Sequence, residues 1–332
     1  MKKIIPILIL IFFLTGNRSA KAQDFHLSMY DAGPLFLNPA MTGVVDATWR
    51  VHAQYRNQWR SVAFKPYSTA LISFDAPVKK WGFGGQVMNM RAGIGNYNVF
   101  QAMFSTAYQV SFDKNKYHNL SLGLQAGVTQ KSVEYKIFTF DNQYVTTNGG
   151  GFDQSINNQE SFQRQSMILP QVNAGAMYYY SRMQSRLNPF IGASAFNLTQ
   201  PKETYFGASN NLPMRIYIHS GIRVNITEQF YILPKMLIMM QKNAQEQTYA
   251  LDAGYFMGGS ELWLLGGFVY RSKDAAIISL GARKDNYIAK LSYDVNISTL
   301  SATSSGRGAF EISFTYMGRK PKVKQVKSCP RL

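Results

Sequence analysis

The sequence has little cysteine and little charge. Cys329 is the only cysteine among 332 residues, which excludes an intrachain disulfide and leaves burial and hydrogen bonding to stabilise the chain. Charged residues make up 16% of the chain, whereas soluble domains carry about 25%. Aromatic residues reach 14%, although the mean hydropathy is slightly negative. This composition is typical of a membrane-spanning β-barrel, in which outward positions are apolar and inward positions are polar.

Long apolar runs are also missing after the N-terminal region. No later stretch has 18 consecutive apolar residues, which excludes spanning helices. The apolar run at 4–14 follows two lysines and is broken by polar residues at 16–18, so it is too short for an anchor helix. An Ala-Lys-Ala sequence at 20–22 provides a signal-peptidase site. We predict a signal peptide at 1–22 and an exported mature chain that begins at Gln23.

Acidic residues are about half as frequent as basic ones. The chain has 35 Lys and Arg against 18 Asp and Glu. Four of the basic residues and none of the acids lie in the predicted signal, so the mature chain keeps 31 against 18, a net charge of +13. A basic balance suits nucleic acid, an anionic membrane surface or an acidic protein. Because an exported chain rarely meets nucleic acid, we expect a membrane or protein partner and no nucleic acid.

Residues that carry chemistry are scarce as well. The four histidines are His26, His52, His118 and His219. His26 and Ser28 have the spacing of a His and Ser pair, but they precede the first expected strand. There is no paired cysteine, no pair of histidines at helical spacing and no calcium-loop motif. Asp141, Asp153 and Glu160 are scattered in a long polar loop, which favours a solvated loop over a calcium site. We therefore expect no enzyme activity, no metal and no cofactor.

Alternation of apolar and polar residues is the dominant pattern from Trp49 onward. In WRVHAQYRN, at 49–57, one face is apolar and the other polar, as in a strand with one wet face. Pro234 predicts a bulge or a shifted boundary in the ninth such run, because proline has no N–H to donate. We expect an all-β protein, a transmembrane antiparallel outer-membrane β-barrel of about 14 strands of roughly ten residues each. The expected strands are 49–57, 67–75, 81–91, 99–112, 118–131, 171–181, 189–197, 215–225, 229–241, 248–257, 261–271, 275–283, 286–296 and 308–317.

The connections predict how the barrel is oriented. Every second connection is short, as at 77–80 and 113–116, and the longest, 132–170 and 297–307, fall between them. Because outer-membrane barrels have short periplasmic turns and long outer loops, we expect the tail at 318–332 to be periplasmic. Two interpretations fit this tail about equally well: a solvated basic tail, or a segment that docks to an acidic periplasmic partner. Its basic residues are Arg319, Lys320, Lys322, Lys324, Lys327 and Arg331.

Seven basic residues are predicted to face the barrel interior. Such residues suit an anion-attracting channel. A barrel of this size must also fill or hydrate its interior, and pairing with inward acids achieves this without transport, so we favour a filled interior. The seven residues are Arg50, Arg56, Arg91, Arg215, Arg223, Lys235 and Lys290.

The stretch YDAGPLFLNPAMTGV, which begins at Tyr30, is apolar but broken by Pro and Gly. Asn38 is suited to cap a short helix that begins at Pro39 and is closed by Gly43. Burying each large apolar side chain contributes roughly 1.5–3 kcal/mol, so the stretch is costly to leave in water. We predict that it folds into the lumen or across its periplasmic opening as a plug or brace. The candidate residues are Leu35, Phe36, Leu37, Asn38, Pro39 and Met41.

Several of these segments resemble a known family. The mature N-terminus QDFHLSMYDAGPLFLNPAMTG, the motif YRNQW at 55–59 and the segment KPYSTALISFDAPV at 65–78 are similar to PorP/SprF proteins of the type IX secretion system. The ending SCPRL at 328–332 looks like the Cys-Pro-Arg-aromatic terminus common in that family, with Leu in place of the aromatic residue. The resemblance covers essentially the whole mature chain and is most specific at its two ends.

The resemblance implies an integral outer-membrane protein, not an enzyme, that supports the secretion or surface anchoring of one client. That client is of the kind represented by a gliding adhesin with a type B C-terminal sorting domain. The implied partners are the client, the translocon, periplasmic ring or linker proteins, and outer-membrane lipid. The alternative is a diffusion channel or hydrophobic-solute transporter, which the barrel size and basic interior favour. The expected organisation is a signal at 1–22, a plug or brace at 23–48, a barrel at 49–317 and a tail at 318–332.

Overall fold

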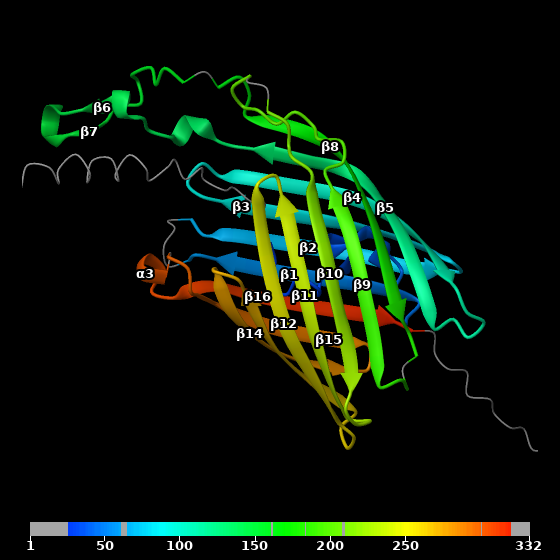
Figure 1. The fold of residues 1–332 in the computed structure, drawn as a ribbon. Coiled ribbons are helices and arrows are strands. Elements are labelled where there is room, and N and C mark those ends of the chain that lie inside the picture. The colour runs from blue at the N-terminus through cyan, green and yellow to red at the C-terminus, as the bar shows by residue number, and fades with distance from the viewer. Residues whose placement is uncertain are drawn as a thin grey trace, which may run out of the picture.

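Fourteen strands form a closed antiparallel barrel in the computed structural model, which describes residues 26–60, 65–160, 162–182, 184–207, 210–299 and 301–319 (Figure 1). Each strand pairs with its neighbours along the barrel, and β1 closes the ring against β16. The all-β prediction of about 14 strands is confirmed, because each expected run overlaps one strand. The barrel strands are β1 (Trp49–Gln58), β2 (Tyr67–Val78), β3 (Trp81–Ala92), β4 (Tyr97–Ser111), β5 (His118–Ser132), β8 (Ser166–Tyr180), β9 (Leu187–Phe196), β10 (Arg215–Asn225), β11 (Phe230–Gln241), β12 (Ala244–Met257), β13 (Leu262–Arg271), β14 (Ala275–Lys284), β15 (Tyr287–Asn296) and β16 (Arg307–Gly318).

The other elements are short and are not part of the barrel wall. β6 and β7 form a separate two-stranded sheet in the connection from β5 to β8, and this hairpin projects away from the barrel (Figure 1). In the described part of the chain, no helix is both long and apolar enough to cross a membrane. These elements are α2 (Pro34–Leu37), η1 (Pro39–Met41), η2 (Tyr135–Ile137), η3 (Asp141–Gln143), β6 (Tyr144–Val145), η4 (Thr147–Gly149), β7 (Gly151–Phe152) and α3 (Ser301–Ser304).

The alternating sequence places opposite chemistry on the two faces of the wall. In β16, Phe310 and Ile312 are exposed on the outward face, whereas Glu311 between them is fully buried inside. The outward face is apolar elsewhere as well, with Ile72 and Phe104 each 60% exposed. An apolar outer band on an even number of antiparallel strands is the pattern of an outer-membrane barrel.

The two ends of the barrel differ in their connections. At one end, six connections have two to six residues each; we call this the turn end. The opposite end, which we call the loop end, carries the connection at 133–165 and those at 197–214 and 297–306. Both β1 and β16 meet the turn end, where Trp49 is paired with Gly318. The predicted asymmetry of the connections is therefore present.

Two local predictions were wrong. Pro234 causes no bulge: the register of β11 against β12 runs through it without a shift. The pairing of β10 with β11 is only interrupted beside Pro234, between Gly221 and Val224, and resumes in the same register, because the missing N–H affects one edge alone. Arg91 is exposed on the outward face, since Met90 and Ala92 occupy the inward positions at that end of β3.

Candidate functional site

Residues 26–48 fill the interior of the barrel. At the start of this segment, His26 Nδ1 lies 3.5 Å from a carboxylate oxygen of Glu246, near the loop end of β12. At its end, the Thr48 N–H donates to the Gly318 carbonyl at the turn end. The segment therefore runs the length of the lumen before β1 begins, and we call residues 26–48 the plug.

The Asn38 side chain joins the plug to three strands. Its Oδ1 accepts from the Ala40 N–H at 2.9 Å, which caps η1. Its Nδ2 donates to the carbonyls of Ala176 on β8 and Ala193 on β9, at 3.1 and 3.3 Å, and lies 3.1 Å from His219 Nε2 on β10. Because Asn38 is fully buried, each of these hydrogen bonds satisfies a group that water cannot reach.

Glycines in the wall make room for this turn. A Cβ added at Gly175 of β8 would lie 2.0 Å from Asn38 Oδ1, and one at Gly123 of β5 would lie 2.3 Å from the Ala40 nitrogen. A Cβ added at Gly82 of β3 would lie 2.1 Å from the Thr42 carbonyl oxygen. Any larger residue would displace the plug, so these positions form a shallow seat for the Asn38 turn.

The apolar plug residues complete two clusters inside the barrel. Leu27 and Phe36 pack with inward residues of β2, β3 and β4, among them Leu71 and Met88. Tyr30 and Leu37 pack with inward residues of β9 to β14. Burying each such side chain contributes roughly 1.5–3 kcal/mol, so the plug holds its place largely through the hydrophobic effect.

Buried charges tie the beginning of the plug to the strands that close the ring. Glu311 of β16 accepts from the backbone N–H groups of Ser28 and Met29, at 2.8 and 2.9 Å. Arg56 of β1 pairs with Glu311 at 3.2 Å and with Asp294 of β15 at 3.1 Å. The Ser28 hydroxyl donates to Asp294 at 2.6 Å. We call Ser28, Arg56, Asp294 and Glu311 the seam network, because they lie where β1 meets β16.

Other basic residues of the lumen also have acidic partners. Lys235 of β11 lies 2.6 Å from Asp31 of the plug and 2.8 Å from Asp252 of β12. Arg50 of β1 pairs with Asp75 of β2 at 2.8 Å, and Asp75 also accepts from the Gly43 N–H at 2.7 Å. Buried charged residues therefore contact the plug at three places: at its beginning through the seam network, at Asp31, and at Gly43 near the turn end.

Six of the seven basic residues predicted to face the interior do so, and Arg91 does not. Lys290 pairs with Asp252 at 3.4 Å. The guanidinium carbon of Arg223 lies 3.8 Å from the centre of the Tyr231 ring, a cation–π contact. With Arg50, Arg56 and Lys235 held by acids, the arrangement agrees with a filled interior better than with an anion channel.

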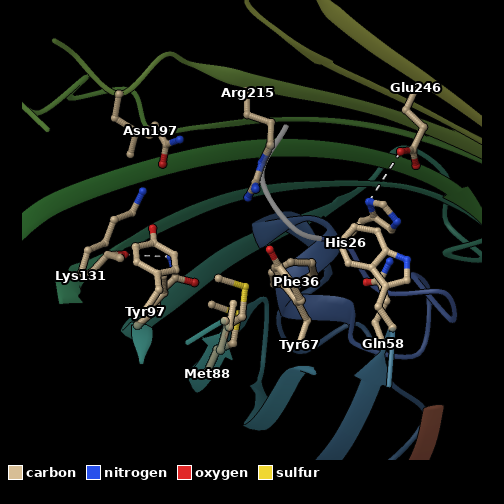
Figure 2. Close-up of a pocket in the computed structure, with 18 of the residues that line it drawn as sticks. His26, Phe36, Gln58, Tyr67, Met88, Tyr97, Lys131, Asn197, Arg215 and Glu246 are labelled. Carbon is tan, nitrogen blue, oxygen red and sulfur yellow. Dashed lines mark hydrogen bonds and ion pairs between the residues drawn. The ribbon is translucent and has the colours of Figure 1, made fainter. Parts of the chain in front are cut away.

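A cavity of about 830 Å³ remains at the loop end, above the plug. Figure 2 shows Phe36 and His26 at its base, Met88 and Tyr97 beside them, and Arg215 pointing into it from above.

A family model described as type IX secretion system membrane protein PorP/SprF matches residues 19–316. The chain belongs to the PorP/SprF family. No curated protein matched the chain.

Solved structures share the fold of this PorP/SprF protein at low identity. The CymD monoaromatic hydrocarbon channel is 13% identical, with a TM-score of 0.51 over 87% of this chain and 93% of that one. The Pseudomonas putida toluene transporter TodX is 9% identical, with a TM-score of 0.50 over 90% of this chain and 95% of that one. These similarities are to the fold alone.

The structure places the sequence-predicted residues of this PorP/SprF protein at two sites. The six plug candidates, Leu35, Phe36, Leu37, Asn38, Pro39 and Met41, lie together inside the barrel. Of the six tail candidates, Arg319 lies 3.8 Å from Asp46 at the turn end. Lys320, Lys322, Lys324, Lys327 and Arg331 fall outside the described residues, as does the predicted signal at 1–22.

Sequence reasoning expected inward acids to pair with the basic residues, but it did not identify the acids and glycines that hold the plug. Glu311 and Asp294 are the only acids of β16 and β15, and both lie at inward positions, so their rarity was a usable sign that they have partners, although it does not show which ones. Gly123 and Gly175 look like ordinary strand glycines, and only the path of the plug shows their purpose. Within the described ranges, no group of three or more His, Cys, Asp or Glu side chains is arranged to hold a metal ion.

Proposed function

We propose that this protein is a non-enzymatic outer-membrane component of the type IX secretion system that supports secretion or cell-surface anchoring of one client protein. A gliding adhesin with a type B C-terminal sorting domain is the kind of client we propose. The observation that carries the proposal is a barrel of the PorP/SprF family whose interior is occupied by its own N-terminal segment. A filled lumen suits a docking or anchoring protein better than a conduit.

The proposal assigns the two ends of the barrel to two compartments. The turn end faces the periplasm, in keeping with the short turns of outer-membrane barrels, and the basic tail after Gly318 meets acidic ring or linker proteins of the secretion system there. The loop end, with its cavity and the β6–β7 hairpin, faces the cell exterior and contacts the client and the translocon there. The apolar outward face contacts outer-membrane lipid.

The second candidate function is a diffusion channel or a hydrophobic-solute transporter. The loop-end cavity favours it, and CymD and TodX are described as a hydrocarbon channel and a toluene transporter. The plug opposes it, because the path from the cavity to the turn end is occupied by buried side chains. Ion conductance separates the two candidates.

Surface display in a deletion strain tests the proposed function. Removing the gene is expected to abolish display of one or a few secreted proteins, detected by surface biotinylation and mass spectrometry, and plasmid-borne wild type should restore it. Normal display of every secreted protein in the deletion strain contradicts the proposal.

Truncation tests the role of the tail. A chain truncated after Arg319 should keep a folded barrel but lose periplasmic proteins on co-purification. Unchanged co-purification contradicts the role of the tail.

A further inference from the structure

Two arginines at the turn end face the lumen without an acidic partner. Arg223 lies near the end of β10, and Arg283 lies near the end of β14 on the same face as the buried Ser279. Both side chains are half-buried, and Arg223 Nε donates only to the neutral Asn225 Oδ1, at 3.0 Å. In the described part of the chain no carboxylate lies within ion-pair distance of either guanidinium, whereas Lys235, deeper in the lumen, has two. Because a half-buried charge without a partner is costly, an anion from outside the chain would be stabilised here.

Aromatic side chains surround these two arginines. The guanidinium carbon of Arg223 lies 3.8 Å from the ring centre of Tyr231 and 6.0 Å from that of Trp263. Trp263 is paired with Arg283 between β13 and β14, and its ring centre lies 5.2 Å from that of Phe256 on β12. Stacking on an aromatic face orients a guanidinium and leaves the N–H groups at its edge to bind an anion. The site therefore combines oriented charge with apolar surface.

A third arginine adds to the positive charge at this end. Arg319 follows β16, and both Arg319 and Arg223 repel the charge of Arg283. Asp46 acts on Arg283 with the opposite sign and lies 3.8 Å from Arg319, but its side chain is 98% exposed, so water screens its charge. We call Arg223, Arg283 and Arg319 the turn-end arginines.

The rest of the chain does not neutralise this cluster. Glu228, Glu261 and Asp285 lie in exposed turns at the same end, and among the described residues none of them forms an ion pair with a turn-end arginine. Residues 320–332 contain five basic side chains and no acidic one. Because Arg223 and Arg283 face the lumen, the barrel wall separates them from the surrounding lipid. An anion that neutralises them would therefore enter the mouth of the barrel from the turn end.

We propose that the turn-end arginines bind an acidic segment of a periplasmic protein. This inference rests on the proposed function, which places the turn end in the periplasm, and it names the residues and the chemistry of that contact. Carboxylates of the segment accept hydrogen bonds from Arg223 and Arg283, and its apolar side chains pack against Phe256 and Trp263. A peptide matches both features of the site, whereas a free phosphate matches only the charge.

Photo-crosslinking in cells tests this inference. A photoreactive phenylalanine replaces either Phe256, on the inward face near the turn-end arginines, or Tyr255, the preceding residue of β12, which is 49% exposed on the outward face. The two probes lie at the same depth of the wall and point to opposite faces. We expect position 256 to crosslink a periplasmic protein through a peptide with two or more acidic residues, and position 255 not to capture that protein.

Two double variants isolate the role of the arginines. R223Q/R283Q should lower the crosslinking yield from position 256 about tenfold or more, because it removes charge-assisted hydrogen bonds. K80Q/K114Q removes the same charge from two exposed turns of the turn end, between β2 and β3 and between β4 and β5, and should change the yield by less than about twofold. The tail is intact in both variants, and both must first show the heat-dependent gel shift of a folded barrel. The comparison of positions 256 and 255 uses the wild-type arginines and does not depend on these variants.

The inference is overturned if position 256 captures no periplasmic protein, if position 255 captures the same protein equally well, or if the captured peptide has no acidic residue. A yield for R223Q/R283Q equal to that of wild type also overturns it. Loss of display in the deletion strain supports the proposed function whatever position 256 captures, so the two can fail separately.

Discussion

Replacing Glu311 with alanine is expected to lower the free energy of unfolding of the barrel by about 3–5 kcal/mol. Glu311 is fully buried and accepts from Ser28, Met29, Gln54 and Arg56. Without it, the Arg56 guanidinium keeps only Asp294 as an acidic partner, which Arg271 shares. The two plug N–H groups also lose their acceptor, at a cost of about 1–3 kcal/mol each when buried.

Urea titration followed on denaturing gels measures this loss. Unheated samples show the folded barrel as a compact band, and the midpoint is the urea concentration at which half of that band is lost. E311Q keeps the size of the side chain and one acceptor oxygen, so its midpoint should lie between those of E311A and wild type. E228A, at an exposed turn-end position, is the matched control and should match wild type. A midpoint for E311A equal to that of wild type would show that the seam network does not stabilise the barrel.

Replacing Gly175 with valine is expected to expel the Asn38 turn from its seat. A Cβ at this position would lie 2.0 Å from Asn38 Oδ1 and 3.2 Å from Pro39 Cδ, and valine adds two further methyl groups. Overpacking of this kind costs about 1–3 kcal/mol, which corresponds to roughly a 5- to 150-fold rise in the population with the turn displaced.

Thiol labelling of a T42C/C329S background measures that population. Thr42 is fully buried, so Cys at this position should react slowly with a maleimide in the parent and at least about fivefold faster after G175V. G266V is the control, since no heavy atom lies within 4 Å of a Cβ there. If G175V leaves Cys at position 42 as protected as the control does, the proposed seat is wrong.

The wall of the barrel could be predicted from sequence because each strand carries its own period-two signal. Because side chains on the two faces of a strand meet lipid and lumen, the alternation within β1 or β16 identifies each strand without information on the neighbouring strands. The inward assignment of Arg91 was wrong because it rested on charge alone. Near the end of a strand, an arginine on the outward face also suits the membrane boundary. Pro234 shows that a missing N–H can be absorbed by one interrupted pairing without a bulge.

The interior could be predicted only in part. Composition and turn residues indicated that the Asn38 stretch folds inward, because its apolar side chains are local information. The partners of that stretch are not local. Asn38 bonds to carbonyls 138 and 155 positions away, and Ser28 to a carboxylate 283 positions away. Closure of the barrel decides which residues meet, so neither the seat at Gly175 nor the pairings within the seam network can be read from a short window of sequence.

Ion conductance of the purified wild-type protein in planar lipid bilayers tests the central claim most directly. Because the plug occupies the lumen and is held by the seam network, by Lys235 and by the Asn38 turn, we predict no steady current, while a porin added to the same bilayer conducts. A stable, ohmic current carried by the wild-type barrel would contradict a closed lumen and favour the channel alternative.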